Sequence, residues 1–559
     1  MSLQFITGNS GNGKTKYLFN RIVKEAKANP RDNYLVIVPE QFTMQTQRQL
    51  VDLSENKAIM NIDVLSFKRL AYRVFDELGI TNLTVLEETG KNLVLRKLAA
   101  QEADKLGVIG RNLNRIGYIS EVKSLLSELV QYNISPEELG RYIASGRLSD
   151  TLSDKLKDVL VLYEAFEKFM QDKYITAEEI LNVLSNVAEE SAILRNSVIA
   201  FDEFTGFTPI QNQLIKKLFV ISKKIYVTLT IDCREDIFKS RGMQELFDMP
   251  KRTVKSLTEM AAFYGIEVEE PIILDKNYRL AENEELSFME QQLFRKRRHS
   301  FKKAPKHIHI DCLRDPKQEL TKIARRINEL VRNENLRYRD IAIVTGDVNI
   351  YAGYVREIFD KYNIPYFIDA TQEILFHPFI EFIRSIPDIA AQNFSADAVF
   401  RFLRCGFSEL LDSEIDVLEN YVLACGVRGK SAWDKKWVRL PKHKAGYDIE
   451  LLNQSREYIM ELLKPVYQVF SDKKSTVKDY VLAIYKLIVL LDIPDKLAKK
   501  EQALLDAGDQ TASKEYGQIY KIVMQLFEKY VAVLGDECMD AEEFTQILDA
   551  GLDAADVAV

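Results

Sequence analysis

The sequence predicts an α/β fold built from two α/β units, each accompanied by a large helical insertion. Near the N-terminus, short apolar runs typical of buried parallel strands alternate with amphipathic helical patterns, and this alternation returns later in the chain. Long segments between these stretches show only helical periodicity. With 559 residues the chain is too long for a single hydrophobic core, so several domains are expected.

The N-terminal strand is expected to lead directly into a glycine-rich loop and then into a helix. The loop is Gly8-Asn9-Ser10-Gly11-Asn12-Gly13-Lys14-Thr15, which has the Gly, four residues, Gly-Lys-Thr spacing of a phosphate-binding loop. Glycines let backbone N–H groups surround phosphate oxygens, and the positive end of the following helix favours an anion. Lys14 is expected to reach the β- and γ-phosphates and Thr15 to ligate Mg²⁺. These residues therefore predict binding of ATP or GTP.

The first α/β unit is expected to continue through further buried strands, at residues 34–39, 61–67, 197–201 and 224–231. Residues 84–191 interrupt this pattern with long helical segments, enough for a separate subdomain. The sequence thus predicts a first unit at residues 1–80 plus 191–290, with a helical insertion at residues 81–190.

A basic linker, residues 295–306, precedes the second unit and contains seven Lys or Arg residues with Phe301 among them. It is either a DNA contact that neutralises phosphates or a solvated linker, and the second interpretation is slightly favoured. The second unit is predicted at residues 291–375, with a helix at 318–332 and strands at 307–313, 341–344 and 366–368. Residues 376–559 are predicted to form its helical insertion.

The strand predicted at residues 197–201 ends in Asp202-Glu203. Next to a phosphate loop, the Asp holds the Mg²⁺ shell and the Glu positions or activates the attacking water. The alternative is an ordinary strand exit, where acidic residues are common. The catalytic interpretation of Asp202 and Glu203 is favoured because the carboxyl ends of parallel strands meet at one edge of the sheet.

Composition narrows the class of protein. The net charge of −7 excludes a global basic field, so any contact with nucleic acid must come from local patches. The five cysteines are scattered without a CxxC pair, which favours a reducing compartment and argues against a zinc site. Residues 480–491 are apolar but short and interrupted by Lys486, so they predict a buried helix and not a membrane span. A cytoplasmic protein without membrane association is expected.

Several motifs resemble those of superfamily-1 (UvrD-like) DNA helicases. Residues 202–211 resemble their Asp-Glu-Phe element, residues 274–279 their Asn-Tyr-Arg motif, and residues 64–71 the segment that touches single-stranded DNA. Within that superfamily the chain is most similar to the AddB (RexB-like) subunits of bacterial ATP-dependent helicase–nucleases. The phrases that carry this likeness are residues 38–43, 207–209, 338–347, 364–369 and 377–379. The likeness covers the whole chain.

The resemblance implies two RecA-like lobes, ATP and Mg²⁺ as ligands, and Arg279 close to the γ-phosphate. It also implies an AddA-like helicase–nuclease subunit as heterodimer partner, binding of single-stranded and double-stranded DNA, and a role in Chi recognition during double-strand break processing for recombination. The family continues into a nuclease domain with a 4Fe–4S cluster. The five cysteines lack the clustered spacing that such a cluster needs. We therefore expect an N-terminal fragment with an incomplete second lobe and without the nuclease site.

Two departures from the helicase pattern predict ATP binding with weak or no motor activity. Glu235 stands where the family has a phosphate-sensing Gln, and it is expected to repel a γ-phosphate. The late motifs that supply a second arginine are not recognisable. One alternative is therefore a non-hydrolysing scaffold that mainly binds a partner helicase. A small-molecule kinase is less favoured, because it leaves residues 277–279 and the second unit unexplained.

Overall fold

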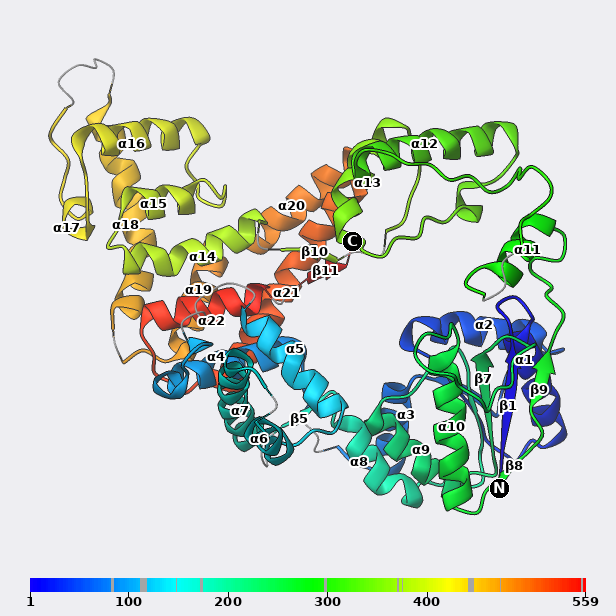
Figure 1. Ribbon diagram of the computed structural model, residues 1–559. Helices are drawn as coiled ribbons and strands as arrows, with labels where there is room; N and C mark the ends of the chain where they lie inside the picture. Colours follow the sequence, from blue (N-terminus) through cyan, green and yellow to red (C-terminus); the bar gives the residue numbers. More distant parts are fainter. Residues whose placement is uncertain are drawn as a thin grey trace. The chain divides into compact units, whose positions relative to one another are not determined.

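The computed structural model describes most of the chain, and it divides into two compact units (Figure 1). The described residues are 1–81, 85–110, 118–146, 148–170, 174–295, 299–368, 371–374, 376–440, 447–472, 474–553 and 556–558. The first unit, called the sheet unit below, comprises Met1–Leu86, Leu125–Arg141 and Met170–Asp311. The second, called the helical unit, comprises Glu87–Ser124, Tyr142–Phe169 and Cys312–Val559.

The sheet unit contains a seven-stranded sheet in the order β3-β2-β6-β7-β1-β8, with β9 also paired to β1. Every pairing in this sheet is parallel. Its strands are β1 (Ser2–Gly8), β2 (Tyr34–Ile37), β3 (Ile62–Leu65), β6 (Val198–Phe201), β7 (Lys224–Thr230), β8 (Glu267–Val268) and β9 (Ile272–Leu274). The strands predicted at residues 34–39, 61–67, 197–201 and 224–231 are therefore confirmed.

Helices cover both faces of this sheet, which explains why its central strands are apolar throughout. Val198 and Ala200 of β6 share a buried cluster with α1 (Lys14–Ala28) and α2 (Thr43–Leu53). Ile199 and Phe201 point to the opposite cluster. That cluster includes α3 (Phe67–Leu78), α8 (Ile180–Val187), α9 (Pro209–Ile221) and α10 (Asp248–Phe263). Alternate residues of a strand face opposite sides, so both sets must be apolar.

The remaining elements of the N-terminal half are mostly helices, as the sequence predicts for residues 84–191. Two short strands, β4 (Val85–Leu86) and β5 (Ile175–Thr176), form a parallel pair in the sheet unit. The helices and turns of this half are η1 (Glu40–Phe42), α4 (Glu88–Gln101), η2 (Ala103–Lys105), α5 (Tyr118–Gln131), α6 (Pro136–Ala144), α7 (Asp150–Met170), η4 (Ala188–Glu190) and α11 (Glu284–Gln292).

Most helices of the helical unit pack around one large hydrophobic core that includes Trp433, Tyr480 and Tyr530. Its later elements are α12 (Pro316–Asn333), η5 (Tyr338–Asp340), α13 (Asn349–Lys361), α14 (Pro378–Ala391), α15 (Ala396–Leu403), α16 (Asp412–Cys425), α17 (Lys430–Trp433), α18 (Ile449–Ser471), α19 (Val477–Leu490), α20 (Ile493–Asp506), α21 (Gln510–Leu534) and α22 (Ala541–Asp553). The strands β10 (Thr371–Glu373) and β11 (Asp556–Ala558) form an antiparallel pair. The helices predicted at residues 318–332 and beyond residue 376 are thus confirmed.

The strands predicted at residues 307–313, 341–344 and 366–368 are wrong. Residues 299–368, all of them described, contain no strand. Ile310, Val344 and Phe367 carry the apolar pattern that predicted strands, yet they are 94%, 92% and 84% exposed. A β-strand forms only where a neighbouring segment exchanges backbone hydrogen bonds with it. No described segment pairs with these residues. Helices α12 and α13 instead pack against each other around Leu320 and Phe359. The predicted domain boundaries stay predictions.

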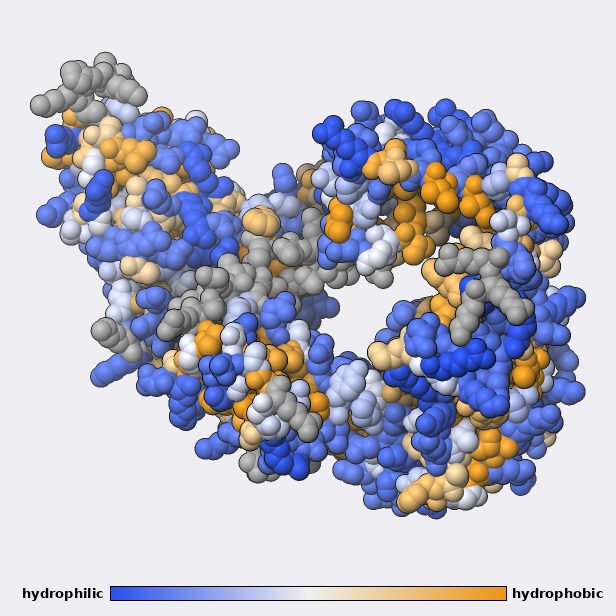
Figure 2. Space-filling view, in the orientation of Figure 1, coloured by the Kyte–Doolittle hydropathy of each residue, from blue (hydrophilic) through white to orange (hydrophobic). Residues whose placement is uncertain are grey.

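Hydrophilic residues dominate the visible surface of both units (Figure 2). Within the described residues, none of the helices combines the length and apolar character that crossing a membrane requires. Trp433 and Trp437 pack against each other with ring centroids 5.2 Å apart and are 0% and 6% exposed. Their rings belong to the core of the helical unit and are not a surface for stacking bases.

Candidate nucleotide-binding site

The phosphate loop lies between β1 and α1, as the sequence predicts. Gly13 caps the N-terminus of α1 with φ 79° and Gly11 has φ 88°, both in the left-handed region that favours glycine. A Cβ atom on Gly11 would lie 2.8 Å from both the Cβ of Arg279 and Oδ1 of Asn277. Gly11 is therefore required for its conformation and for the close approach of the segment that contains Arg279.

Two asparagines of the loop fix its shape through hydrogen bonds to neighbouring segments. Nδ2 of Asn12 donates to the carbonyl oxygen of Leu274 at 2.5 Å. Oδ1 of Asn9 accepts from the N–H of Cys233 at 2.9 Å, and its Nδ2 donates to Oε1 of Glu290 at 2.6 Å. The loop is thus held to the ends of β9 and β7 and to α11 without a ligand.

The Asn-Tyr-Arg segment packs directly on the loop. The N–H of Tyr278 donates to the carbonyl oxygen of Gly11 at 3.0 Å, and Nδ2 of Asn277 donates to that of Ser10 at 3.1 Å. Tyr278 and Arg279 line the same cavity as the loop. Arg279 therefore lies where it can approach a bound phosphate.

Asp202 and Glu203 follow β6 and face Thr15 at the start of α1. Oγ1 of Thr15 lies 3.4 Å from Oδ1 of Asp202 and 3.3 Å from Oε1 of Glu203. The hydroxyl of Thr228 also donates to Oδ1 of Asp202, whereas no described residue donates to its buried Oδ2. Glu203 has φ 64°, an unusual conformation for a non-glycine residue that often occurs at functional sites.

Burial disfavours the charged forms of Asp202 and Lys14 and so shifts their pKa values in opposite directions. It raises the pKa of Asp202, an effect that the Thr228 hydrogen bond opposes and the charge of Glu203 reinforces. Burial also lowers the pKa of Lys14, while the charges of Glu203 and Asp202 oppose this shift and that of Arg279 adds to it. An ammonium and a carboxylate that are both destabilised by desolvation are suited to a ligand that brings its own charges.

The residues fit a magnesium ion that arrives with a nucleotide. Mg²⁺ is usually held by one or two carboxylates, a hydroxyl and substrate phosphates, and not by a complete protein cage. The Thr15 hydroxyl and the unpartnered Oδ2 of Asp202 are oxygen donors of this kind. Accordingly, the described residues contain no group of three or more His, Cys, Asp or Glu side chains that could hold a metal ion alone.

These groups line a cavity of ≈ 780 Å³. Of the predicted site residues, Ser10, Gly11, Gly13, Lys14, Thr15, Asp202, Glu203 and Arg279 line it, whereas Gly8, Asn9 and Asn12 do not. The side chains of Asn9 and Asn12 instead hydrogen-bond the loop to neighbouring segments. The cavity is large enough for a nucleotide, since ligand sites commonly measure about 300–1,000 Å³.

Sequence reasoning missed several lining residues. Thr228 and Thr230 of β7 line the cavity, and their sequence signal is two polar residues on one face at the end of a mostly apolar strand. Gln45, Thr46 and Gln49 of α2 also line it. No sequence signal marks them, because only the packing of α2 brings them near the loop.

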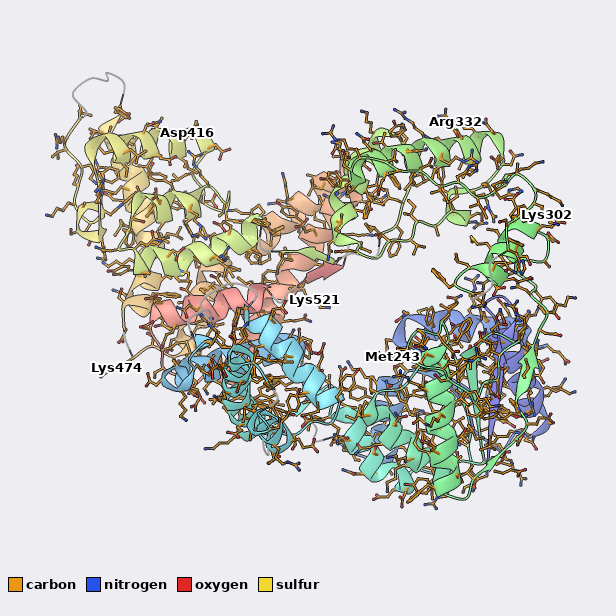
Figure 3. The ribbon with its side chains drawn as sticks, in the orientation of Figure 1. Met243, Lys302, Arg332, Asp416, Lys474 and Lys521 are labelled. Atoms are coloured by element: carbon orange, nitrogen blue, oxygen red, sulfur yellow. The ribbon has the colours of Figure 1, made fainter. Side chains whose placement is uncertain are left out.

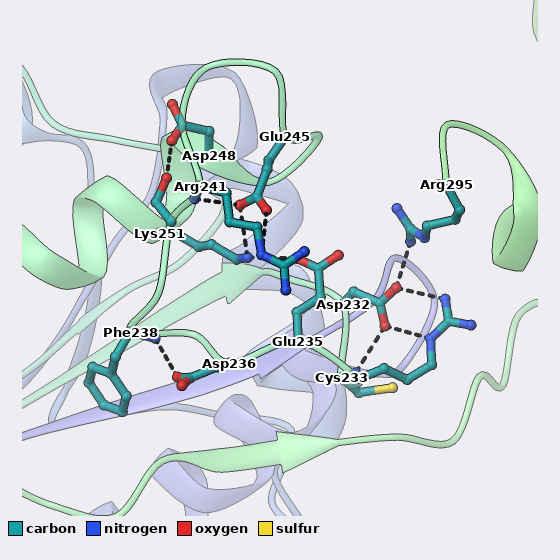
Figure 4. Close-up of polar contacts among 12 residues, drawn as sticks. Asp232, Cys233, Glu235, Asp236, Phe238, Arg241, Glu245, Asp248, Lys251 and Arg295 are labelled. Atoms are coloured by element: carbon teal, nitrogen blue, oxygen red, sulfur yellow. Dashed lines mark hydrogen bonds and ion pairs between the residues drawn. The ribbon is translucent and has the colours of Figure 1, made fainter. Parts of the chain in front are cut away.

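Glu235, which is expected to repel a γ-phosphate, forms an ion pair within the sheet unit (Figure 4). Its carboxylate pairs with Nζ of Lys251 at 2.7 Å and does not line the cavity. Lys251 is 4% exposed and also lies 3.2 Å from Glu245. Burial alone would lower the pKa of Lys251, but the two carboxylates outweigh it and raise the pKa. Glu235 thus shares the charge of Lys251 with Glu245, and its repulsion of a γ-phosphate stays a prediction.

Asp232, the other residue of that helicase motif, is held by two arginines. Its carboxylate accepts from Nε and Nη2 of Arg234 at 2.9 and 2.6 Å and pairs with Nη2 of Arg295 at 2.7 Å (Figure 4). Burial would raise the pKa of Asp232, but Arg234 and Arg295 outweigh it and lower the pKa. Arg295, the first residue of the basic linker, is thus tied to the end of β7. Residues 296–298 of that linker lie outside the described residues.

Residues 64–71, which resemble a DNA-touching segment, form the end of β3 and the start of α3. Oγ of Ser66 caps α3 by accepting from the N–H of Arg69 at 3.2 Å. The ring of Phe67 is 7% exposed and packs against Phe201, Phe204 and Phe207. Arg69 is half exposed and pairs with Glu40 at 3.0 Å.

Comparisons with known proteins found a matching family model and several similar curated proteins. A family model described as "ADDB, N-terminal" matches residues 5–290. Proteins named as a subunit of an ATP-dependent helicase/deoxyribonuclease are similar over nearly the whole chain. That of Lachnoclostridium phytofermentans is 38% identical over 100% of this chain and 49% of its own length. Those of Clostridium acetobutylicum and Caldanaerobacter subterraneus are 31% and 32% identical over 99% and 100% of this chain, and 48% and 49% of their own lengths.

The chain spans about half the length of these curated relatives. The family match covers most of the sheet unit, including the phosphate loop. The chain therefore belongs to the AddB family, matching its N-terminal region.

Proposed function

We propose that this chain binds ATP with Mg²⁺ and single-stranded DNA as part of an ATP-dependent DNA helicase–deoxyribonuclease. The observation that carries the proposal is the convergence of Lys14, Thr15, Asp202, Glu203 and Arg279 on one cavity beside a preformed glycine loop. The printed names of the relatives support the class of activity.

Each side chain has a distinct role in this proposal. Nζ of Lys14 donates to the carbonyl oxygen of Asn9 at 3.0 Å and would transfer this bond to the β- and γ-phosphates. Thr15 and Asp202 would hold Mg²⁺, which neutralises charge on the phosphates when bound. Glu203 would orient the attacking water. Arg279 would stabilise charge on the γ-phosphate.

The proposal also includes the DNA ligand and the partner subunit of the chain. Residues 64–71 would contact single-stranded DNA, with a role in Chi recognition during the processing of double-strand breaks for recombination. The partner would be an AddA-like helicase–nuclease subunit, since the relatives are named as subunits. Double-stranded DNA would be the substrate of that complex. The five free cysteines are scattered through the described chain, which supports a cytoplasmic site of action.

We further propose the domain organisation of two RecA-like lobes. The first would comprise residues 1–80 and 191–290 with its insertion at 81–190, and the second would begin at 291–375 with its insertion at 376–559. The nuclease site and the 4Fe–4S cluster would belong to residues outside this chain.

A separate question is whether ATP bound at this site is hydrolysed to drive a motor. The pairing of Glu235 with Lys251 weakens one ground for a weak motor, because the ammonium group offsets part of the negative charge of Glu235. The unrecognised second arginine motif remains the other ground. A non-hydrolysing scaffold that binds a partner helicase is therefore the alternative function, and the two differ in turnover.

Lys14→Ala tests the proposal. Binding of a fluorescent ATP analogue with Mg²⁺ should weaken by about 100-fold or more, because a charge-assisted contact to phosphate is lost. Lys24→Ala, which removes an exposed lysine of the same helix, is the matched control and should bind like the wild type.

ATP turnover then separates the functions. Hydrolysis that single-stranded DNA stimulates and Lys14→Ala abolishes supports an enzyme, and nucleotide binding without turnover supports the scaffold. Turnover that needs a metabolite but no DNA would support a kinase. A wild-type chain that binds no nucleotide would contradict the proposal.

A further inference from the structure

A second cavity of ≈ 590 Å³ lies in the sheet unit, between α11 and the segment of residues 299–308. We call it the α11 groove. Its walls include three phenyl rings, those of Phe288, Phe294 and Phe301. None of its lining residues is shared with the nucleotide cavity. Figure 3 labels Lys302 on the segment that follows α11.

The groove is built by specific contacts and not by loose packing. The carboxylate of Glu285, which is 9% exposed, accepts from the N–H groups of Lys306 and His307 at 2.7 and 2.8 Å. The rings of Phe288 and Phe301 contact each other with centroids 5.2 Å apart. These contacts hold the returning segment against α11, so the groove is formed before any ligand arrives.

Phe294 stands out at the rim of this groove. It has φ 58°, in the left-handed region where glycine or asparagine is the usual residue. Its side chain is nevertheless 75% exposed, so burial does not offset the cost of this conformation. An aromatic ring kept in a strained and exposed position favours a role in binding over one in folding.

The two walls of the groove differ in charge: α11 carries Glu284 and Glu285, whereas the facing segment is basic. Residues 299–308 include Lys302, Lys303 and Lys306 and no Asp or Glu. Lys303 pairs with Glu284 at 2.5 Å. Lys302 and Lys306 are neighbours in sequence of lining residues and do not line the groove themselves. Both are exposed, and no carboxylate of the described residues pairs with either ammonium group. Exposed aromatic rings beside unpaired cations are the composition of surfaces that bind single strands, since any base can stack and phosphates follow the cations.

We propose that the α11 groove binds single-stranded DNA, with a base stacked on Phe294 and the neighbouring phosphates on Lys302 and Lys306. The site rests on the proposed function, because it assumes that the chain handles single strands. It extends that function to a surface apart from residues 64–71 and the nucleotide cavity. A docked protein segment would use the apolar lining but not the exposed lysines beside it, so we favour a nucleic acid as the ligand.

Fluorescence anisotropy of a labelled oligothymidylate tests the proposal with the whole 559-residue chain. Phe294→Ala should weaken binding by about five- to a hundred-fold, the range found when a base loses an aromatic partner. Phe263→Ala is the matched control, since Phe263 is an 81% exposed ring of the same unit. It should bind like the wild type.

The cations are tested through the salt dependence. The double variant Lys302→Ala/Lys306→Ala should lower the slope of log K against log salt by about 1.4, since each phosphate contact on a single strand contributes about 0.7. Lys24→Ala/Lys57→Ala removes the same charge from another part of the sheet unit and should leave the slope unchanged.

A third variant keeps the aromatic ring and reports stacking directly. Phe294→Trp should retain affinity, and single-stranded DNA should quench the fluorescence of the introduced indole. The two native tryptophans, Trp433 and Trp437, are buried and belong to the helical unit, so their quenching by DNA should be small.

Equal affinity of Phe294→Ala and Phe263→Ala, or an unquenched indole, would overturn the α11 groove while leaving the proposed function intact. Binding of poly-glutamate that depends on Phe294, without dependence for DNA, would overturn it in favour of a protein ligand. A wild-type chain that binds nucleotide but no single-stranded DNA would overturn both the groove and the DNA part of the proposed function.

Discussion

Two stretches of this chain carry the same sequence signal for strands, and only one of them forms a sheet. In the sheet unit, β1 and β7 pair residue by residue from Ser2 with Lys224 to Gly8 with Thr230. In residues 299–368 the apolar runs remain unpaired. Ile199 of β6 is 0% exposed, whereas Val344 is 92% exposed. The apolar pattern shows which segment is able to form a strand. Whether the strand forms depends on pairing with a neighbouring segment.

Hydrogen exchange should show the largest difference between the two stretches. Amides in the centre of β1 and β7 should exchange only through global unfolding, which costs about 5–15 kcal/mol in typical domains. The amides of residues 342–344 make no backbone hydrogen bond to another described residue and should exchange at close to intrinsic rates. Mass spectrometry of peptides from both stretches measures this. Slow exchange at residues 342–344 would show that this segment is paired after all.

Truncation of one side chain in each stretch gives the next largest effect. Ile199→Ala should lower the free energy of unfolding by about 2–5 kcal/mol, because it removes buried atoms and leaves a cavity. Val344→Ala should change it by no more than about 0.5 kcal/mol, since an exposed side chain loses little packing. Urea denaturation followed by circular dichroism measures both, and Ile310→Ala is a second exposed control. Similar losses at Ile199 and Val344 would contradict the difference in burial.

Features that depend on a few neighbouring residues could be predicted from the sequence. The phosphate loop, the Asp202-Glu203 pair at the end of β6 and helix α12 lie where the sequence predicts them. The loop is recognisable because Gly11 and Gly13 need conformations that few other residues adopt. Parallel strands bring Thr15 and Asp202 together at one sheet edge, so their proximity was also predictable.

Features that depend on contacts between distant residues could not be predicted. The pairing of Glu235 could not be foreseen because its partner Lys251 lies on α10, and a sequence does not show which lysine a carboxylate will meet. Asn9 similarly joins the phosphate loop to Cys233 and Glu290. The wrong strands at residues 307–313, 341–344 and 366–368 have the same cause, since pairing is a tertiary property.

Helix caps should give the smallest effect, and an equal one in the two stretches, because a cap is local. Thr208 caps α9 in the sheet unit, where its N–H also donates to Oε1 of Gln211 at 2.9 Å. Asp315 caps α12, with Oδ1 accepting from the N–H of Gln318 at 2.8 Å. Thr208→Ala and Asp315→Ala should each cost about 1 kcal/mol of unfolding free energy in urea denaturation.

Thr208→Ser and Asp315→Asn keep a capping oxygen and should restore most of that stability. A loss at Asp315 far below that at Thr208 would mean that α12 is weakly formed. The lack of strand pairing in residues 299–368 would then also lower the stability of the adjacent helices. Equal losses would confine the difference between the two stretches to strand pairing alone.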